Sequence, residues 1–302
     1  MSTTSASRYA ITKEAAGKQR AGDRLKARVF HALMLFSLAV GIITLAVLLI
    51  QVLVEGWPRL NMDLLTNFPS RRPGSAGAQS AIFGTLWLMG IVMVTAIPLG
   101  FGTAIYLEEY ADPKRWYNRL IELNIQNLAA VPSIVYGILG LAFLARGPLG
   151  LGRTLLAGGL TLTLLVLPIV IIAGREAIRA VPNSIRQASL ALGATKWQTV
   201  SRQVLPAAIP GMATGTILGL SRAIGETAPL ILLGALTFVT FNPDGLTSQF
   251  TALPIQIFNW ISRPQAEFKV LAAAAIVVLL VVLLAMNSVA IWLRNRYYRR
   301  SW

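Results

Sequence analysis

Two charged residues of this sequence stand four positions apart in a segment that is otherwise free of charge. Arg222 and Glu226 interrupt the uncharged residues 203–243. A spacing of four places both side chains on one face of a helix, within reach of each other. An arginine guanidinium matches the oxygens of an oxyanion, and a neighbouring carboxylate can compete for the same donors. The pair therefore predicts either an anion-handling site or a structural ion pair that fixes helix packing.

The energetic cost of burying these charges favours the functional interpretation. A charged side chain in the middle of a membrane span costs ~2.5–3.5 kcal/mol on insertion scales. A hydrophobic pair would often stabilise packing equally well, so an ion pair is a poor device for stability alone. Arg175, which follows the uncharged residues 154–174, is a further candidate for the anion pathway, although snorkelling to the membrane interface also explains its position.

The composition shows what kind of element must carry these residues. Of the 302 residues, 55% are hydrophobic and only 13% are charged, against about 25% charged in a typical soluble domain. The mean hydropathy is +0.63. So few ionisable groups cannot build a water-facing surface, which indicates an integral membrane protein. The sequence has no cysteine and a single histidine, His31, so we expect no disulfide, no metal centre and no catalytic triad.

Long apolar segments predict an all-α integral membrane protein with six transmembrane helices. A spanning helix needs ~20 residues. The expected spans are residues 30–54, 79–107, 123–145, 154–174, 211–236 and 269–293. A basic tail at residues 1–28 precedes them, and we expect it to lack regular structure and to stay in the cytoplasm. The membrane domain would then extend over residues 29–302.

Basic residues supply an independent test of this topology. With the N-terminus inside, 19 of the 27 lysines and arginines fall on the cytoplasmic side and 7 on the external side. This bias agrees with the positive-inside rule. Both chain ends are therefore expected in the cytoplasm, and Arg222 is the one basic residue that the topology does not explain.

The longest internal cytoplasmic segment, residues 175–210, predicts two short helices joined by a glycine. Ser184 and Thr195 each precede a glutamine by three residues, which is the spacing of a capping box. Gly193 stands between them, where a helix can end in a left-handed residue. Taken alone, such an amphipathic hairpin can also lie on the membrane surface.

This segment resembles the cytoplasmic signature of permease subunits of ATP-binding-cassette importers. That signature reads Glu-Ala-Ala-x3-Gly-x9-Ile-x-Leu-Pro, and here residues 187–193 and 203–206 align with it. Gln187 replaces the glutamate of the family, and Gln203 replaces its isoleucine. The resemblance implies that the segment is a coupling helix that docks in a groove of a cytoplasmic ATPase. Its candidate docking residues are Gln187, Ala188, Ser189, Leu192, Gly193, Lys196, Leu205 and Pro206.

Two further motifs narrow the resemblance to the permeases of phosphate importers. Residues 131–137 read Val-Pro-Ser-Ile-Val-Tyr-Gly, and residues 220–230 read Leu-Ser-Arg-Ala-Ile-Gly-Glu-Thr-Ala-Pro-Leu. Both are similar to phosphate-importer permeases. The Ala-Pro-Leu ending is similar to the subunits called PstA rather than to their partners, called PstC. The resemblance extends roughly from Ile82 to the C-terminus.

The resemblance implies a fold, a location and a set of partners. The fold would be a MetI-like importer permease core with one extra N-terminal helix, in a bacterial inner membrane. The partners would be a homologous PstC-like permease, a dimer of PstB-like ATPases and an external PstS-like phosphate-binding protein. The sequence contains no Gly-x4-Gly-Lys-Ser/Thr loop. We therefore expect no cofactor on this chain and no enzymatic activity, with ATP and Mg²⁺ used by the partner ATPase, and we expect no nucleic-acid partner.

Other functions stay open at this point. The chain can be a permease for another oxyanion, such as sulfate or molybdate. A secondary transporter or channel could use Arg222 and Glu226 without ATP, but it would have no need of a docking loop. A membrane enzyme is disfavoured because the carboxylates of Glu108, Glu109 and Asp112 are expected to form a solvated turn.

Overall fold

The computed structural model describes residues 4–235 and 238–298, and every regular element within them is helical. The chain divides into two units, residues 1–54 and 55–302. The first unit consists of α1 (Thr4–Gly56), a helix of 53 residues that ends just beyond it. The basic tail was expected to be irregular, but it is helical from Thr4 onwards. The segment is rich in alanine, lysine and arginine and contains no proline, so its helix propensity is high.

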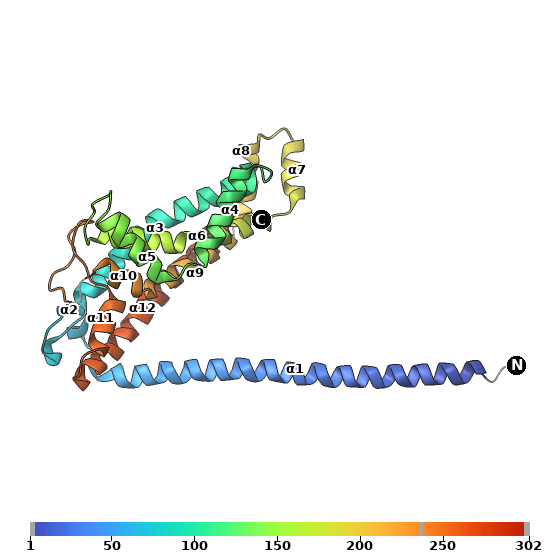
Figure 1. Cartoon of the computed structure of the whole chain (residues 1–302), viewed down its shortest axis with the longest axis horizontal. Coiled ribbons are helices and arrows are strands. Elements are labelled where there is room, and N and C mark those ends of the chain that lie inside the picture. The colour runs from blue at the N-terminus through green and yellow to red at the C-terminus, as the bar shows by residue number, and fades with distance from the viewer. Residues whose placement is uncertain (1–3, 236–237, 299–302) are drawn as a thin grey trace. The chain divides into compact units, whose positions relative to one another are not determined.

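Four long helices form the bundle of the second unit: α3 (Gln79–Ile105), α6 (Leu155–Arg179), α9 (Leu205–Gly225) and α12 (Ala266–Tyr298). Helix α3 packs along α6, α6 along α9, and α9 along α12 (Figure 1). With 25 residues, α6 is ~38 Å long, which exceeds the ~30 Å hydrocarbon core of a bilayer. Their shared core is apolar, and it buries side chains such as Val92 completely.

A stripe of glycines brings α9 close to α6. Gly211, Gly215 and Gly219 follow one another at intervals of four along α9. A Cβ atom on Gly215 would collide with the Cβ of Ala173 on α6, and one on Gly219 would lie 2.9 Å from Cγ1 of Val166. Small residues at such positions let two helix backbones approach closely inside a membrane.

The span expected at residues 123–145 is broken in the structure. It consists of α4 (Trp116–Ala129) and of α5 (Ser133–Leu139), which continues as η4 (Gly140–Ala145). The two parts meet at an angle of 111°. Pro132 explains the break. A proline has no backbone N–H to donate, and it disfavours helical conformation in the residue before it.

The span expected at residues 211–236 is also interrupted. Helix α9 ends at Gly225, and Glu226 has an extended backbone with φ −77° and ψ 112°. A second short helix, α10 (Ala228–Leu233), begins two residues later and ends at Gly234, whose φ of +95° favours glycine. Glu226 therefore lies at the break between two helices rather than inside a continuous span.

The two ends of the bundle carry different short elements. Figure 1 shows α2 and α11 at one end, and α7 and α8 at the other. The first end contains η1 (Trp57–Arg59), α2 (Met62–Thr66), η2 (Pro73–Ser75) and α11 (Leu253–Ile261). The second end contains η3 (Tyr106–Tyr110), α7 (Asn183–Ala191), α8 (Lys196–Thr199) and η5 (Val200–Val204). Each end has its own apolar cluster, the first around Trp260 and Phe268 and the second around Ile178 and Met212.

The number of membrane-spanning elements agrees with the sequence. Five single helices of the described residues are long and apolar enough to cross a membrane, and the bent pair α4–α5 gives a sixth when its two parts are counted as one span. The prediction of an all-α membrane protein with six spans is confirmed.

Candidate functional site

Arg222 and Glu226 form the ion pair that their spacing predicts. Arg222 lies in the last turn of α9, and its Nε donates a hydrogen bond of 3.1 Å to Oε1 of Glu226. The Arg222 side chain is 45% exposed and that of Glu226 is 16% exposed. Within the described residues no other hydrogen bond of the Arg222 guanidinium is found. Because a guanidinium carries five N–H donors, most of them stay available to a ligand.

The ion pair lies close to a contact between two broken helices. Helix α5 packs against α10, and a Cβ atom on Gly137 would lie only 2.6 Å from Cα of Pro229. Tyr136 spans the bend between α4 and α5, because its hydroxyl donates a 2.8 Å hydrogen bond to the carbonyl of Leu128. The motifs at residues 131–137 and 220–230, which are far apart in the sequence, are thus brought side by side.

A polar contact fixes the last turn of α9 from the other side. Ser221 precedes Arg222, and its hydroxyl donates a 3.0 Å hydrogen bond to Oδ1 of Asn287 on α12. Since Arg222 itself is bonded to no other helix among the described residues, this contact positions the turn while the guanidinium stays free to reorient.

Arg175 has a different environment. Its Nε donates to Glu108 and its Nη2 to Glu122, both at 2.7 Å, and its side chain is only 11% exposed. Two carboxylates at this distance satisfy the guanidinium and join α6 to η3 and α4. The arrangement favours a structural role for Arg175, and its place in an anion pathway stays a prediction.

The prediction that residues 108–112 form a solvated turn is wrong for Glu108 and Glu109. The side chains of Glu108 and Glu109 are 13% and 9% exposed, whereas Asp112 is exposed and pairs with Arg115 at 3.8 Å. The low exposure of the two glutamates results from tertiary contacts. The partners of Glu108 and Glu109 are arginines of α6 and α7, more than sixty positions away in the sequence.

The docking loop, which consists of α7, the turn at Gly193 and α8, has the helix–glycine–helix shape that the sequence predicts. Thr195 and Gln198 form a complete capping box, with Oε1 of Gln198 accepting a 2.8 Å hydrogen bond from the backbone N–H of Thr195. Gly193 is left-handed, with φ of +82°. The capping box expected at Ser184 is absent. Helix α7 already begins at Asn183, so its N-cap is Pro182, which has no side-chain cap.

The candidate docking residues fall into an exposed group and a supporting group. The exposed group is Gln187, Ala188, Leu192, Gly193 and Lys196. Ser189 is half-buried, and its hydroxyl shares a 2.9 Å hydrogen bond with that of Thr199, so it holds α7 against the end of α8. Leu205 and Pro206 are half-buried at the start of α9. Trp197, which sequence reasoning missed, adds a large exposed apolar side chain beside Lys196.

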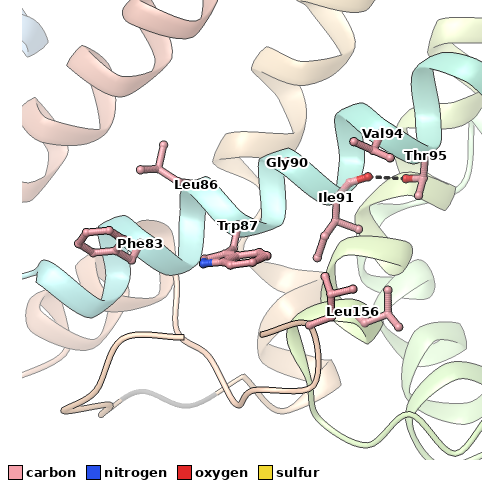
Figure 2. Close-up of a pocket in the computed structure, with 9 residues that line it drawn as sticks. Phe83, Leu86, Trp87, Gly90, Ile91, Val94, Thr95 and Leu156 are labelled. Carbon is pink, nitrogen blue, oxygen red and sulfur yellow. Dashed lines mark hydrogen bonds between the residues drawn. The ribbon is translucent and has the colours of Figure 1, made fainter. Parts of the chain in front are cut away.

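A pocket of about 510 Å³ on α3 lies outside this constellation. Figure 2 shows Phe83, Trp87 and Ile91 projecting from α3 beside Leu156 of α6. Its lining residues are apolar apart from Thr95, whose hydroxyl is already bonded to the Ile91 carbonyl at 2.7 Å. Such a lining offers nothing to neutralise an anion, so we do not place the ion pathway there.

Comparison with known proteins decides the family. Residues 96–300 match the family model described as binding-protein-dependent transport system inner membrane component. The chain belongs to this family. The match extends over the bent pair α4–α5, the docking loop and the Arg222–Glu226 pair, and it confirms the resemblance read from the sequence. As a membrane component of a transport system, the chain is not itself an enzyme.

Relatives within the family cover nearly the whole chain. The phosphate transport system permease protein PstA 1 of Mycobacterium tuberculosis (strain CDC 1551 / Oshkosh) is 34% identical over 92% of this chain and 91% of its own length. The probable ABC transporter permease protein YqgI of Bacillus subtilis (strain 168) is 32% identical over 88% of this chain and 95% of its own. The PstA protein of Yersinia pestis is 31% identical over 93% of this chain and 94% of its own.

Solved structures share the fold. A bacterial alginate ABC transporter in complex with its periplasmic protein has a chain that matches with a TM-score of 0.57 at 17% identity, covering 72% of this chain and 78% of its own. The MetNI methionine ABC transporter in an inward-facing conformation matches with a TM-score of 0.52 at 19% identity, covering 72% and 91%. At these identities the likeness establishes the MetI-like architecture alone.

Proposed function

We propose that this chain is the PstA-type permease subunit of an ATP-driven importer of inorganic phosphate. Relatives that carry the PstA name cover up to 93% of the chain. A PstC protein of Haemophilus influenzae is 31% identical but covers only 74% of the chain. The subunit would form half of the translocation pathway and connect that half to a cytoplasmic ATPase.

The half-exposed Arg222, held by a single hydrogen bond to Glu226, is the observation that carries this proposal. Phosphate is an anion at neutral pH, and an unaccompanied anion cannot enter a low-dielectric span. A guanidinium presents a planar fork of donors that matches two phosphate oxygens at once. Other N–H donors of Arg222 are available, so the guanidinium can bind phosphate before its hydrogen bond to Glu226 breaks.

Glu226 gives the site a means of release. A permanent positive charge in a pathway would retain phosphate, and conduction requires binding that is weak enough to reverse. When the helices move, the carboxylate of Glu226 can replace phosphate on the Arg222 guanidinium. Because Glu226 lies at the break between α9 and α10, a change of angle at that break alters its distance from Arg222. Partner exchange at one arginine would thus accompany the opening and closing of the pathway.

The remaining assignments follow from the docking loop. Its exposed face, formed by α7, Gly193 and α8, would insert into an ATPase, which binds ATP and Mg²⁺ while this chain binds neither. The complete importer would contain a PstC-like permease, two PstB-like ATPases and an external PstS-like phosphate-binding protein. The chain would lie in a bacterial inner membrane with both termini in the cytoplasm, in contact with lipid and not with nucleic acid.

Another oxyanion is the second candidate substrate. Sulfate and molybdate also carry oxygens that fit a guanidinium fork, and nothing in the Arg222–Glu226 geometry rejects them. A secondary transporter or channel is no longer a competing class, because the chain belongs to a family of binding-protein-dependent systems.

Reconstitution tests the proposal. The chain is placed in vesicles with its partner permease, ATPase and binding protein, and uptake of labelled phosphate, sulfate and molybdate is followed with and without ATP. We expect ATP-dependent uptake of phosphate that excess sulfate does not suppress. Uptake of sulfate or molybdate in preference to phosphate would show that the substrate is wrong, and uptake of phosphate without ATP would show that the mechanism is wrong.

A further inference from the structure

A partly buried ion pair joins the docking loop to the membrane helices. Arg186 of α7 donates from Nε and Nη2 to Oε1 of Glu109 in η3, at 3.0 and 2.8 Å. The Arg186 side chain is only 19% exposed. The two residues are 77 positions apart in the sequence, so this contact belongs to the tertiary structure and no local pattern requires it.

The same guanidinium also binds the end of α6. Nη1 of Arg186 donates to the carbonyl of Val181 at 2.6 Å, and Nη2 donates to the carbonyl of Ile178 at 2.9 Å. One side chain therefore holds together α7, the end of α6 and η3, which directly continues α3. A guanidinium is planar and its donors are fixed in direction, so these bonds define an orientation as well as a distance.

Within the described residues, apolar packing of α7 against the membrane helices is limited to the half-buried Ile185, which lies against the cluster around Ile178 and Met212. Within the described residues α7 has no buried side chain. Its other tertiary side-chain hydrogen bond, from Ser189 to Thr199, leads only to α8. On the far side of the loop, Nζ of Lys196 lies 5.0 Å from the ring centre of Tyr110, which again is part of η3. The loop thus touches η3 from both of its helices, and the stronger tie is Arg186–Glu109.

We propose that the Arg186–Glu109 pair transmits movement of the docking loop to α3, with Arg186 as a positioning residue. The inference rests on the proposed function, because it assumes that an ATPase moves the loop. A force applied to α7 reaches η3 through this pair, and α3 is packed along most of its length against α6. Without the pair, only the apolar contact of Ile185 and the Lys196–Tyr110 contact would connect the loop to α3 and η3, so less of the movement of α7 would reach α3.

The decisive variant is Glu109→Gln. It keeps the size of the side chain and leaves the two bonds from Arg186 to the α6 carbonyls intact, so α7 stays folded against α6. In the reconstituted complete importer we expect ATP hydrolysis to continue and the amount of phosphate transported per ATP to fall roughly tenfold, a coupling of the size seen for contacting residues. Arg186→Gln should have the same effect, and the double variant should be no worse than either single one, because the two residues act as a unit.

A matched control is available on α6. Arg179 donates to Glu108 at 2.8 Å, one residue from Glu109, but none of its hydrogen bonds reaches α7. Arg179→Gln should therefore keep the wild-type amount of phosphate per ATP. An equal loss in Arg179→Gln would show that any charge change in this cluster disturbs transport, and it would overturn the specific role of Arg186.

A chemical rescue separates a mechanical connection from a general effect on folding. The natural chain has no cysteine, so Glu109→Cys/Arg186→Cys introduces the only two thiols. A bifunctional thiol reagent that spans the length of the lost side chains should restore the amount of phosphate per ATP. If Glu109→Gln transports the wild-type amount of phosphate per ATP, or if the cross-linked double-cysteine variant still transports less, the inference is wrong while the proposed function stands. A wild-type importer that hydrolyses ATP without taking up phosphate would overturn the proposed function itself.

Discussion

Arg175 and Arg222 each lie near the C-terminal end of a long helix, α6 and α9, but their environments differ, and the contrast identifies the one that suits a transient ligand. Arg175 is buried, and carboxylates at 2.7 Å occupy two of its nitrogens. Arg222 is 45% exposed and has a single carboxylate partner at 3.1 Å. An anion that approached Arg175 would have to displace two close ion pairs in a place of low dielectric, whereas at Arg222 it can use donors that are already free.

Glu226→Gln tests whether the carboxylate moderates the arginine. The amide keeps the shape and can still accept a hydrogen bond, but it no longer neutralises Arg222. Because a partly exposed ion pair is worth up to about 1 kcal/mol, we expect the KM for phosphate to fall severalfold and the maximal uptake rate to fall with it, since release becomes slower. Initial rates of uptake over a range of phosphate concentrations measure both quantities. An unchanged KM would contradict a competing role for Glu226.

At the scale of elements, two broken helices and one glycine stripe organise the bundle. The breaks at Pro132 and Glu226 place short helices α5 and α10 against each other, and the stripe on α9 sets the distance between α9 and α6.

Gly215→Ala should destabilise the bundle. Its Cβ would collide with that of Ala173 on α6, and overpacking of this kind typically costs ~1–3 kcal/mol. The matched control is Gly102→Ala on α3, where a Cβ atom meets nothing within 4 Å and where alanine should gain up to ~1 kcal/mol in helix propensity. The midpoint temperature of thermal unfolding in detergent should fall for Gly215→Ala and rise for Gly102→Ala. A Gly215→Ala variant as stable as wild type would show that α6 and α9 are less closely packed than described.

Gly193→Ala should weaken attachment of the ATPase. Alanine at φ of +82° is strained by ~1–2 kcal/mol, so the angle between α7 and α8 would change. Gly193→Asn should be milder, since asparagine tolerates this conformation better. The amount of ATPase that co-purifies with each variant, relative to wild type, is the measurement. Equal recovery with alanine and asparagine, both at the wild-type level, would contradict the role of the turn.

The sequence predicts those elements whose cause is local. Gly193 and the Thr195 capping box were predictable because the residues that form them are neighbours. The proline at position 132 itself indicates a break, although the uncharged residues around it predict a continuous span. The burial of Glu108 and Glu109 was not predictable, since it depends on Arg175 and Arg186, which are brought there only by folding.

At the scale of the whole molecule, the excess positive charge of +15 agrees with the proposed topology. Most lysines and arginines fall in segments that the positive-inside rule places in the cytoplasm. The docking loop and the C-terminal end of α12 lie at the same end of the second unit, as Figure 1 shows, which is what an ATPase partner on the cytoplasmic side requires.

Single-cysteine variants test this orientation directly, because the natural chain contains no cysteine. Ser7→Cys lies in the N-terminal basic segment, and Ser75→Cys lies in an exposed position of η2. In intact cells, a membrane-impermeant thiol reagent should label Ser75→Cys and should label Ser7→Cys only after the membrane is opened. Labelling of Ser7→Cys in intact cells would place the N-terminus outside and would reverse the whole topology.

Arg222→Gln tests whether Arg222 handles the transported anion. Glutamine keeps a hydrogen-bonding side chain but removes the charge and the planar fork. ATP-driven phosphate uptake is measured in vesicles that contain the fully assembled importer, with Arg71→Gln, which removes an exposed arginine outside the pathway, as the control. We predict that Arg222→Gln assembles normally and loses uptake by at least roughly tenfold, as expected for a lost charge-assisted contact, while Arg71→Gln transports like wild type. An assembled Arg222→Gln importer with wild-type phosphate uptake would contradict the account.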